Sequence, residues 1–233
     1  MLIDRRNTAS LKWDRYSGRD VLPLWVADMD FRSPPTVLEA LHRRIDHGVF
    51  GYTLVPQELV QVVQSTLWEE FGWEVRGEWI VWLPGLVTGL NVACRAAGED
   101  GDEVATLTPV YPPFLSAPGL SRRNLVAVPL AQENKTWTVD FDRLERSLTP
   151  RTRLLLLCNP HNPVGRVFNR EELSTLAALC ERYDLILCSD EIHCGLILDE
   201  DKRHIPIATL DPQVARHTIT LMAPSKTYNI PGL

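Results

Sequence analysis

The side chain best suited to covalent chemistry is the amine of Lys226, in the stretch Ala-Pro-Ser-Lys-Thr-Tyr-Asn at residues 223–229. The apolar run at residues 218–222 precedes it and predicts a buried strand. Ligands of open α/β sheets bind beyond the carboxyl ends of the strands, so we expect Lys226 at such a crevice. A partly desolvated amine there can form a Schiff base with a carbonyl. Its position alone also fits an ordinary solvated loop lysine.

Two further turns follow predicted strands and suit a phosphate and an aromatic ring. Gly85, Leu86 and Val87 form a glycine-containing turn that opens a helix, where backbone N–H groups and the helix dipole favour an anion. Any tight strand-to-helix turn can use a glycine, so this signal has low specificity. Tyr111 lies in a proline-rich loop after the strand predicted at residues 103–107, and its ring is a candidate for stacking.

Polar residues also follow the strands predicted at residues 153–158 and 185–188. Asn162 lies in a stiff Asn-Pro-His-Asn-Pro-Val-Gly turn and can donate a hydrogen bond into the crevice. Asp190 is a carboxylate at the end of a buried strand, so it needs a cationic partner or several hydrogen bonds to stay ionised. Taken singly, Asn162 also fits a turn former, Asp190 a helix cap and His193 a core histidine.

Together these residues predict a site for pyridoxal 5′-phosphate (PLP). An anchored carboxylate suits a protonated pyridine nitrogen, an aromatic ring suits stacking, and a lysine suits an aldehyde, while Ser225 and a glycine turn suit a phosphate. A zinc site built from Cys188, His193 and Cys194 is the alternative for part of this region. Their spacing fits no standard zinc pattern, so we expect no metal.

Composition indicates a globular protein with no nucleic-acid or membrane partner. Among 233 residues, 45% are hydrophobic and 23% charged, and the formal net charge is −6. No basic stripe suggests nucleic acid, and no apolar run has transmembrane length. The first seven residues contain no apolar signal-peptide core, and the five cysteines form no C-x-x-C pair. We therefore expect a cytoplasmic protein with reduced thiols.

The order of elements predicts an α/β fold. Apolar runs predict strands at residues 79–83, 103–107, 125–128, 153–158, 185–188 and 218–222, and amphipathic patterns predict helices at residues 56–71, 88–97 and 171–183. An earlier helix is expected between a cap at Ser33 and Gly48, and a capping box at Asn169 and Glu172 opens the last one. Such alternation predicts a three-layer α/β/α arrangement with a mainly parallel sheet.

Five motifs in a fixed order carry a resemblance to a known family. They lie at residues 24–31 (Leu-Trp-Val-Ala-Asp-Met-Asp-Phe), 51–53 (Gly-Tyr-Thr), 159–165, 189–193 (Ser-Asp-Glu-Ile-His) and 223–229. With them the sequence resembles the fold-type-I, PLP-dependent aminotransferase superfamily, and within it the branch of cystathionine β-lyases and related C–S lyases. The motif at residues 24–31 separates this branch from ordinary aspartate aminotransferases.

The resemblance implies roles for five residues around the cofactor ring. Lys226 would hold PLP as a Schiff base, and Asp190 would pair with the pyridinium nitrogen. Asn162 would hydrogen-bond the ring's 3′-oxygen, and Tyr111 would stack on the ring. His193 lies where aspartate aminotransferases carry a tyrosine near that oxygen.

The resemblance also implies how the cofactor phosphate is held. Ser225 and the backbone of Gly85, Leu86 and Val87 would bind it. Tyr52 looks like the tyrosine that reaches the phosphate of the neighbouring subunit, which implies a homodimer with shared active sites.

The implied activity is that of a PLP-dependent C–S β-lyase on amino-acid substrates. In such an enzyme Lys226 removes the α-proton as a general base, and elimination yields a thiol, pyruvate and ammonia. An aminotransferase shares the same residues and instead returns a proton to the cofactor carbon. The sequence does not decide between the two outcomes, nor does it identify the amino acid.

Family members continue for a further ~100–200 residues, about one domain. We therefore expect that residues 1–48 are an arm and helix of the small domain and that residues 49–233 are an incomplete large domain. The C-terminal small domain and the arginine that binds the substrate carboxylate would be missing. A truncated, inactive remnant that at most binds PLP or a partner is thus a third hypothesis.

Overall fold

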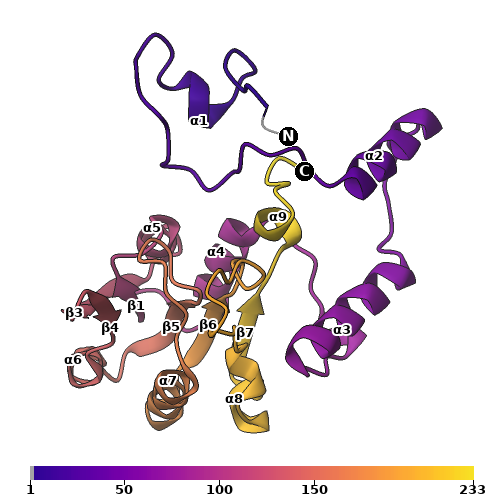
Figure 1. The fold of residues 1–233 in the computed structure, drawn as a ribbon. Coiled ribbons are helices and arrows are strands. Elements are labelled where there is room, and N and C mark those ends of the chain that lie inside the picture. The colour runs from indigo at the N-terminus through magenta and orange to yellow at the C-terminus, as the bar shows by residue number, and fades with distance from the viewer. Residues whose placement is uncertain (1–2) are drawn as a thin grey trace. The chain divides into compact units, whose positions relative to one another are not determined.

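A computed structural model describes residues 3–233 (Figure 1). Contacts within the chain separate it into two units, which are described one at a time. The larger unit is Val55–Ala223, and the smaller unit combines the residues up to Leu54 with Pro224–Leu233. In the described part of the chain, no helix is both long enough and apolar enough to cross a membrane.

The larger unit is built on a five-stranded sheet in the order β2-β1-β5-β6-β7. Every pairing in this sheet is parallel, so the carboxyl ends of its strands lie along one edge. The strands are β1 (Glu103–Thr108), β2 (Asn124–Pro129), β5 (Thr152–Cys158), β6 (Ile186–Asp190) and β7 (Thr218–Leu221). Parallel sheets are covered on both faces, which is why β5 reads as a nearly continuous run of leucines.

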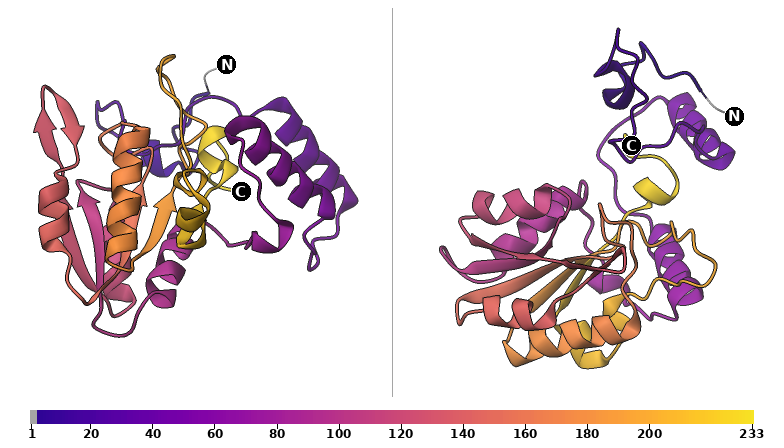
Figure 2. Two further views of the ribbon diagram at one scale, coloured as in Figure 1. Left: turned by 90° about the horizontal axis from the view of Figure 1, so that it is seen from below. Right: turned by 60° about the vertical axis from the view of Figure 1, so that its left-hand side comes forward.

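Helices cover both faces of this sheet, as Figures 1 and 2 show. One face carries α4 (Leu86–Ala96) and α5 (Pro113–Leu120), and the other carries α6 (Phe141–Ser147), α7 (Arg170–Arg182) and α8 (Pro212–Arg216). The predicted three-layer α/β/α arrangement is therefore confirmed. The unit also contains α3 (Gln57–Phe71), the 3₁₀ turns Gly77–Trp79 and Ile207–Thr209, and a hairpin of β3 (Ala131–Glu133) and β4 (Thr136–Thr138).

Two apolar clusters fill the spaces between the sheet and its helices. Successive side chains of a strand alternate between faces, so Leu155 and Leu157 pack with α7, while Leu154 and Leu156 pack with α4 and α5. All four leucines are buried. The same alternation at the ends of β5 and β6 sets the direction of the polar residues described below.

The predicted capping box of α7 is confirmed. The Glu172 backbone N–H donates to the Asn169 side chain at 2.9 Å, and the Asn169 backbone N–H donates to the Glu172 carboxylate at 2.9 Å. These bonds satisfy two of the N–H groups that have no partner within a helix.

The smaller unit contains α1 (Leu11–Asp14), α2 (Pro35–His47) and α9 (Pro224–Thr227). Gly48 ends α2 with a φ of 73°, as the sequence predicts. The predicted cap at Ser33 is wrong, because the helix begins after Pro34 without a side-chain cap. The Ser33 hydroxyl donates instead to the carbonyl of Asn229 at 3.3 Å.

The strand predicted at residues 79–83 is also wrong. Trp79 ends a 3₁₀ turn, and residues 80–83 are not assigned to a strand. A strand needs a neighbouring backbone, and these residues have no strand partner within residues 3–233. Val81 is accordingly 76% exposed, although its pattern resembles that of a buried strand.

Candidate functional site

Three of the predicted site residues meet at the carboxyl edge of the sheet. Tyr111 follows β1, Asn162 follows β5 and Asp190 ends β6, and these strands are neighbours in the order β1-β5-β6. The Tyr111 N–H donates to the Asn162 carbonyl at 3.1 Å, and the Asn159 N–H donates to the Asp190 carbonyl at 3.0 Å. Backbone hydrogen bonds thus connect the loops that carry all three residues.

His161 joins two of these loops through its buried ring. One ring nitrogen, Nε2, lies 2.8 Å from the Pro109 carbonyl, and Nδ1 lies 3.1 Å from the Cys158 carbonyl. Burial lowers the pKa of His161, although both carbonyls favour the protonated ring. At neutral pH the ring is therefore uncharged and donates from one nitrogen. His161 belongs to the motif at residues 159–165 but was not among the predicted site residues.

The carboxylate of Asp190 is buried at this edge, with the residue 5% exposed. One of its oxygens accepts the backbone N–H of Ile192 at 3.1 Å. Burial, with the nearby negative charge of Asp190, raises the pKa of the Cys158 thiol to about 12. Burial and the same carboxylate also raise the pKa of Cys188. Both cysteines belong to the cluster packed against α4 and α5, so Asp190 lies on that face of the sheet.

A second buried carboxylate, Glu191, lies on the opposite face. One oxygen accepts the Ser189 hydroxyl at 2.8 Å and the Ile207 backbone N–H at 3.2 Å. The other oxygen lies 2.7 Å from His204 Nε2, and the side chains of this pair are 0% and 1% exposed. Because a carboxylate oxygen only accepts, His204 donates this bond from Nε2–H, and its Nδ1 has no hydrogen-bond partner within residues 3–233.

The Glu191 network fixes the turn that carries Asp190 and His193. The Glu191 backbone N–H also donates to the Leu221 carbonyl at 2.8 Å, which joins the end of β6 to β7. Neither Glu191 nor His204 was among the predicted site residues. The sequence signal that could have identified Glu191 is its position at the end of a buried strand, because a buried carboxylate needs a hydrogen-bonding partner.

The predicted phosphate turn precedes α4 in the same unit. Gly85 has a φ of 104°, a conformation that residues with a side chain rarely adopt. No side chain caps α4, so the first-turn N–H groups of Leu86 and Val87 are not used by a cap. The arrangement suits an anion, and the phosphate role of these residues remains a prediction.

The remaining predicted site residues, Tyr52, Ser225 and Lys226, belong to the smaller unit. Ser225 and Lys226 lie in α9, directly after the end of β7 in the chain, and Lys226 is half-buried. Tyr52 lies in an extended segment and is fully exposed. No set of three or more potential metal ligands occurs within residues 3–233.

Comparison with known proteins identifies the family. The model of the aminotransferase class I and II family matches residues 19–233. The chain belongs to this family. The matched residues include Asp190 at the end of β6 and the loops after β1 and β5 that carry Tyr111 and Asn162.

Three relatives are similar to this chain over nearly its whole length. Cystathionine beta-lyase PatB of Bacillus subtilis (strain 168) is 43% identical over 235 residues, covering 99% of this chain and 60% of PatB. The crystal structure of OvoB is 46% identical with a TM-score of 0.96, covering 99% of this chain and 61% of OvoB. The PLP-bound C–S lyase of Staphylococcus hominis is 34% identical with a TM-score of 0.93, and the match covers 100% of this chain and 60% of the lyase chain. The chain thus spans about 60% of the length of these relatives.

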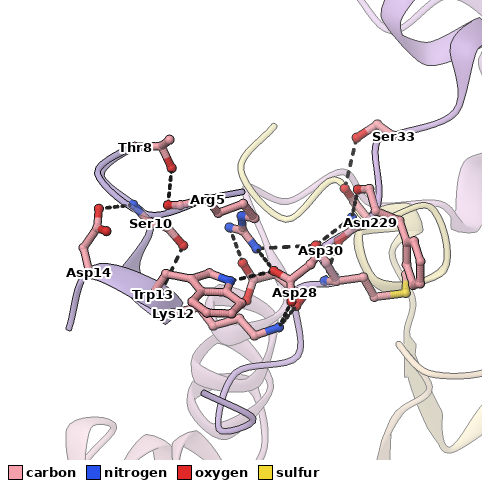
Figure 3. A network of polar contacts seen from close by, with 12 residues as sticks. Arg5, Thr8, Ser10, Lys12, Trp13, Asp14, Asp28, Asp30, Ser33 and Asn229 are labelled. Carbon is pink, nitrogen blue, oxygen red and sulfur yellow. Dashed lines mark hydrogen bonds and ion pairs between the residues drawn. The ribbon is translucent and has the colours of Figure 1, made fainter. Parts of the chain in front are cut away.

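The motif at residues 24–31, which the sequence analysis associated with the lyase branch, lies in a polar network of the smaller unit (Figure 3). Asp30 accepts hydrogen bonds from Lys12 Nζ and Trp13 Nε1, both at 2.8 Å, and from Arg5 at 3.2 Å. Arg5 also pairs with Asp28 at 2.5 Å. These contacts fix the backbone of the motif by charge and hydrogen bonds.

Proposed function

We propose that this chain is the cofactor-binding part of a PLP-dependent C–S β-lyase acting on sulfur-containing amino acids. The observation that carries the proposal is the buried Asp190 carboxylate at the end of β6, on the same edge as Tyr111 and Asn162. Relatives named as cystathionine beta-lyase and as a PLP-bound C–S lyase support the same activity. Expected products are a thiol, pyruvate and ammonia.

The groups of the larger unit fit the cofactor. Asp190 supplies a buried anion for a protonated pyridine nitrogen, and Tyr111, 41% exposed, presents a ring for stacking. The Asn162 amide can donate to a ring oxygen. The uncapped start of α4 after Gly85, with the N–H groups of Leu86 and Val87, suits a phosphate.

Four residues complete the proposed site. Lys226 would hold the cofactor aldehyde through its amine, and Ser225 would contribute to phosphate binding. His193 lies in the turn after β6, and we assign it to the surroundings of the ring. Tyr52 would reach the phosphate bound to a second copy of the chain, in a cytoplasmic homodimer.

When bound, PLP supplies an electron sink that makes the α-proton of an amino acid acidic. The Lys226 amine would accept that proton at Nζ as general base. Asp190 would hold a proton on the pyridine nitrogen, and one oxygen of this carboxylate accepts the Ile192 N–H. The Glu191 network and His161 hold the surrounding loops, so the reacting groups need little reorganisation.

Labelling with PLP tests the proposal. The purified chain should develop a visible absorption band with PLP, and borohydride should fix the cofactor on the peptide that contains Lys226. Lys226→Ala should lose the band, whereas Lys202→Ala, at an exposed lysine, should keep it. A folded chain in which borohydride attaches PLP elsewhere would contradict the proposed role of Lys226.

An aminotransferase is the second candidate, because the family is named for that activity. Incubation with cystathionine separates the two activities. Pyruvate formed without a keto-acid acceptor supports the lyase, and turnover that requires an acceptor supports the aminotransferase. A labelled Lys226 without either activity would identify the chain as a PLP-binding module.

A further inference from the structure

Asn229, three residues after Lys226, binds the backbone of the motif at residues 24–31, the arm motif, with its side chain (Figure 3). Its Oδ1 accepts the Met29 N–H at 2.8 Å. Its Nδ2 donates to the Met29 carbonyl at 3.1 Å and to the Phe31 carbonyl at 2.9 Å. One amide thus occupies both backbone groups of Met29 and one of Phe31, as a neighbouring β-strand would.

The backbone of Asn229 is fixed to the same segment and to α9. Its carbonyl accepts the Ser33 hydroxyl at 3.3 Å, and its N–H donates to the Lys226 carbonyl at 3.3 Å. The φ of Asn229 is 54°, and asparagine adopts this left-handed region more readily than most residues. One residue therefore ends the turn that carries Lys226 and attaches it to residues 29–33.

The segment that Asn229 binds is itself held in place. Asp30 lies between the two residues whose carbonyls accept from Asn229 Nδ2, and it is fixed by Lys12, Trp13 and Arg5. Lys12 also donates to the Asp28 carbonyl at 2.9 Å. The Lys12 side chain is only 7% exposed, so this charge is held in a partly desolvated position.

We propose that Asn229 is a positioning residue for Lys226, and that residues 28–31 serve as the fixed base to which the lysine-bearing turn is attached. The inference rests on the proposed function, in which Lys226 forms the Schiff base with PLP. In addition to that function, the arm motif contributes to the chemistry of Lys226 through the backbone groups that the Asn229 side chain binds.

Asn229→Gly tests this role without backbone strain, because glycine accepts a positive φ. The variant loses three side-chain hydrogen bonds, so we expect borohydride labelling of Lys226 by PLP to become at least about tenfold slower. The midpoint of the pH titration of the visible band should also shift, since the lysine nitrogen no longer has a fixed environment. The matched control is Asn134→Gly, at an exposed hairpin residue with a φ of 48°, and it should change neither readout.

Asn229→Asp provides a second variant that retains the acceptor for the Met29 N–H and loses both donations. It also sets a carboxylate oxygen against the Met29 and Phe31 carbonyls, so its labelling rate should likewise fall below that of the wild type. If the glycine variant loses its far-ultraviolet circular dichroism, the aspartate variant decides. Failure of the wild type to label Lys226 overturns the proposed function. A labelled wild type whose Asn229 variants match it in rate and pH midpoint overturns only the positioning role.

Discussion

The two units of this chain are stabilised by different interactions. In the larger unit, two apolar clusters pack against a parallel sheet, and its buried carboxylates are held by hydrogen bonds. Among the described residues of the smaller unit, the buried ones are Ser10, Lys12 and Pro23, and an ion-pair network holds the arm. Hydrophobic burial is insensitive to moderate salt, whereas partly exposed ion pairs are screened. We therefore expect the units to respond to different perturbations.

The largest effect should come from a cavity in the larger unit. Leu156→Ala removes a fully buried side chain from β5 and should lower the free energy of unfolding by about 4 kcal/mol, because the lost transfer energy and the cavity add. Urea denaturation followed by circular dichroism measures the change. Leu198→Ala, at a leucine 91% exposed, is the control and should leave the midpoint unchanged. Equal losses in both variants would show that the cluster does not determine stability.

A smaller loss is expected from Glu191→Gln. The Glu191 carboxylate accepts from three groups: the Ser189 hydroxyl, the Ile207 N–H and His204 Nε2. In the glutamine variant one of the two oxygens becomes an NH₂ group, which is a donor. At least one of the buried donors therefore loses its acceptor. We expect a decrease of about 2 kcal/mol in the free energy of unfolding, measured in urea. Glu200→Gln, at an exposed position, controls for the change of charge. A stability equal to that of the wild type would mean that the network carries no net energy.

The smallest effect concerns the smaller unit and depends on pH. Burial alone would raise the pKa of Asp30, but hydrogen bonds from Lys12, Trp13 and Arg5 lower it below the usual 3.8. A lowered pKa stabilises the folded arm fully above the unfolded value, and this stabilisation is lost as the pH falls through the folded value. The Trp13 indole N–H resonance should therefore move only in acid, and high salt should weaken the contact.

Asp30→Asn removes the titrating group and retains acceptors for hydrogen bonds. We expect the acid transition of Trp13 to disappear and the arm to lose about 1 kcal/mol, as for partly exposed ion pairs. An acid transition that persists in this variant would assign it to another group. Comparison with Leu156→Ala shows whether the arm opens without loss of the sheet.

Buried elements were predictable because their patterns record burial. The strands predicted at residues 153–158 and 218–222 agree with β5 and β7 within one residue at each end. β5 is a buried parallel strand with a continuous run of leucines, whereas in β7, at the edge of the described sheet, only Leu221 is buried. Residues 79–83 have a similar composition and are not a strand. Composition records that a segment favours burial, whereas a strand also requires a neighbouring backbone, which composition does not specify.

The site was predictable to the extent that topology determines it. Tyr111, Asn162 and Asp190 follow strands, and a parallel sheet brings such positions to one edge. The contact of Glu191 with His204 depends on the path of an irregular loop that has no periodic pattern. The contacts of Asn229 with Met29 join residues 200 positions apart, beyond the reach of any local rule.

Asp190 and Glu191 are adjacent in sequence yet lie in different surroundings, one facing the α4 and α5 side and the other facing His204. A shift of β6 by a single residue relative to its neighbours would exchange these two carboxylates between the faces. The deletion or insertion of one residue within β6 would therefore place Glu191 on the face of the proposed cofactor site and Asp190 on the face of His204. The length of β6 is therefore constrained to the residue, whatever side chains fill its other positions.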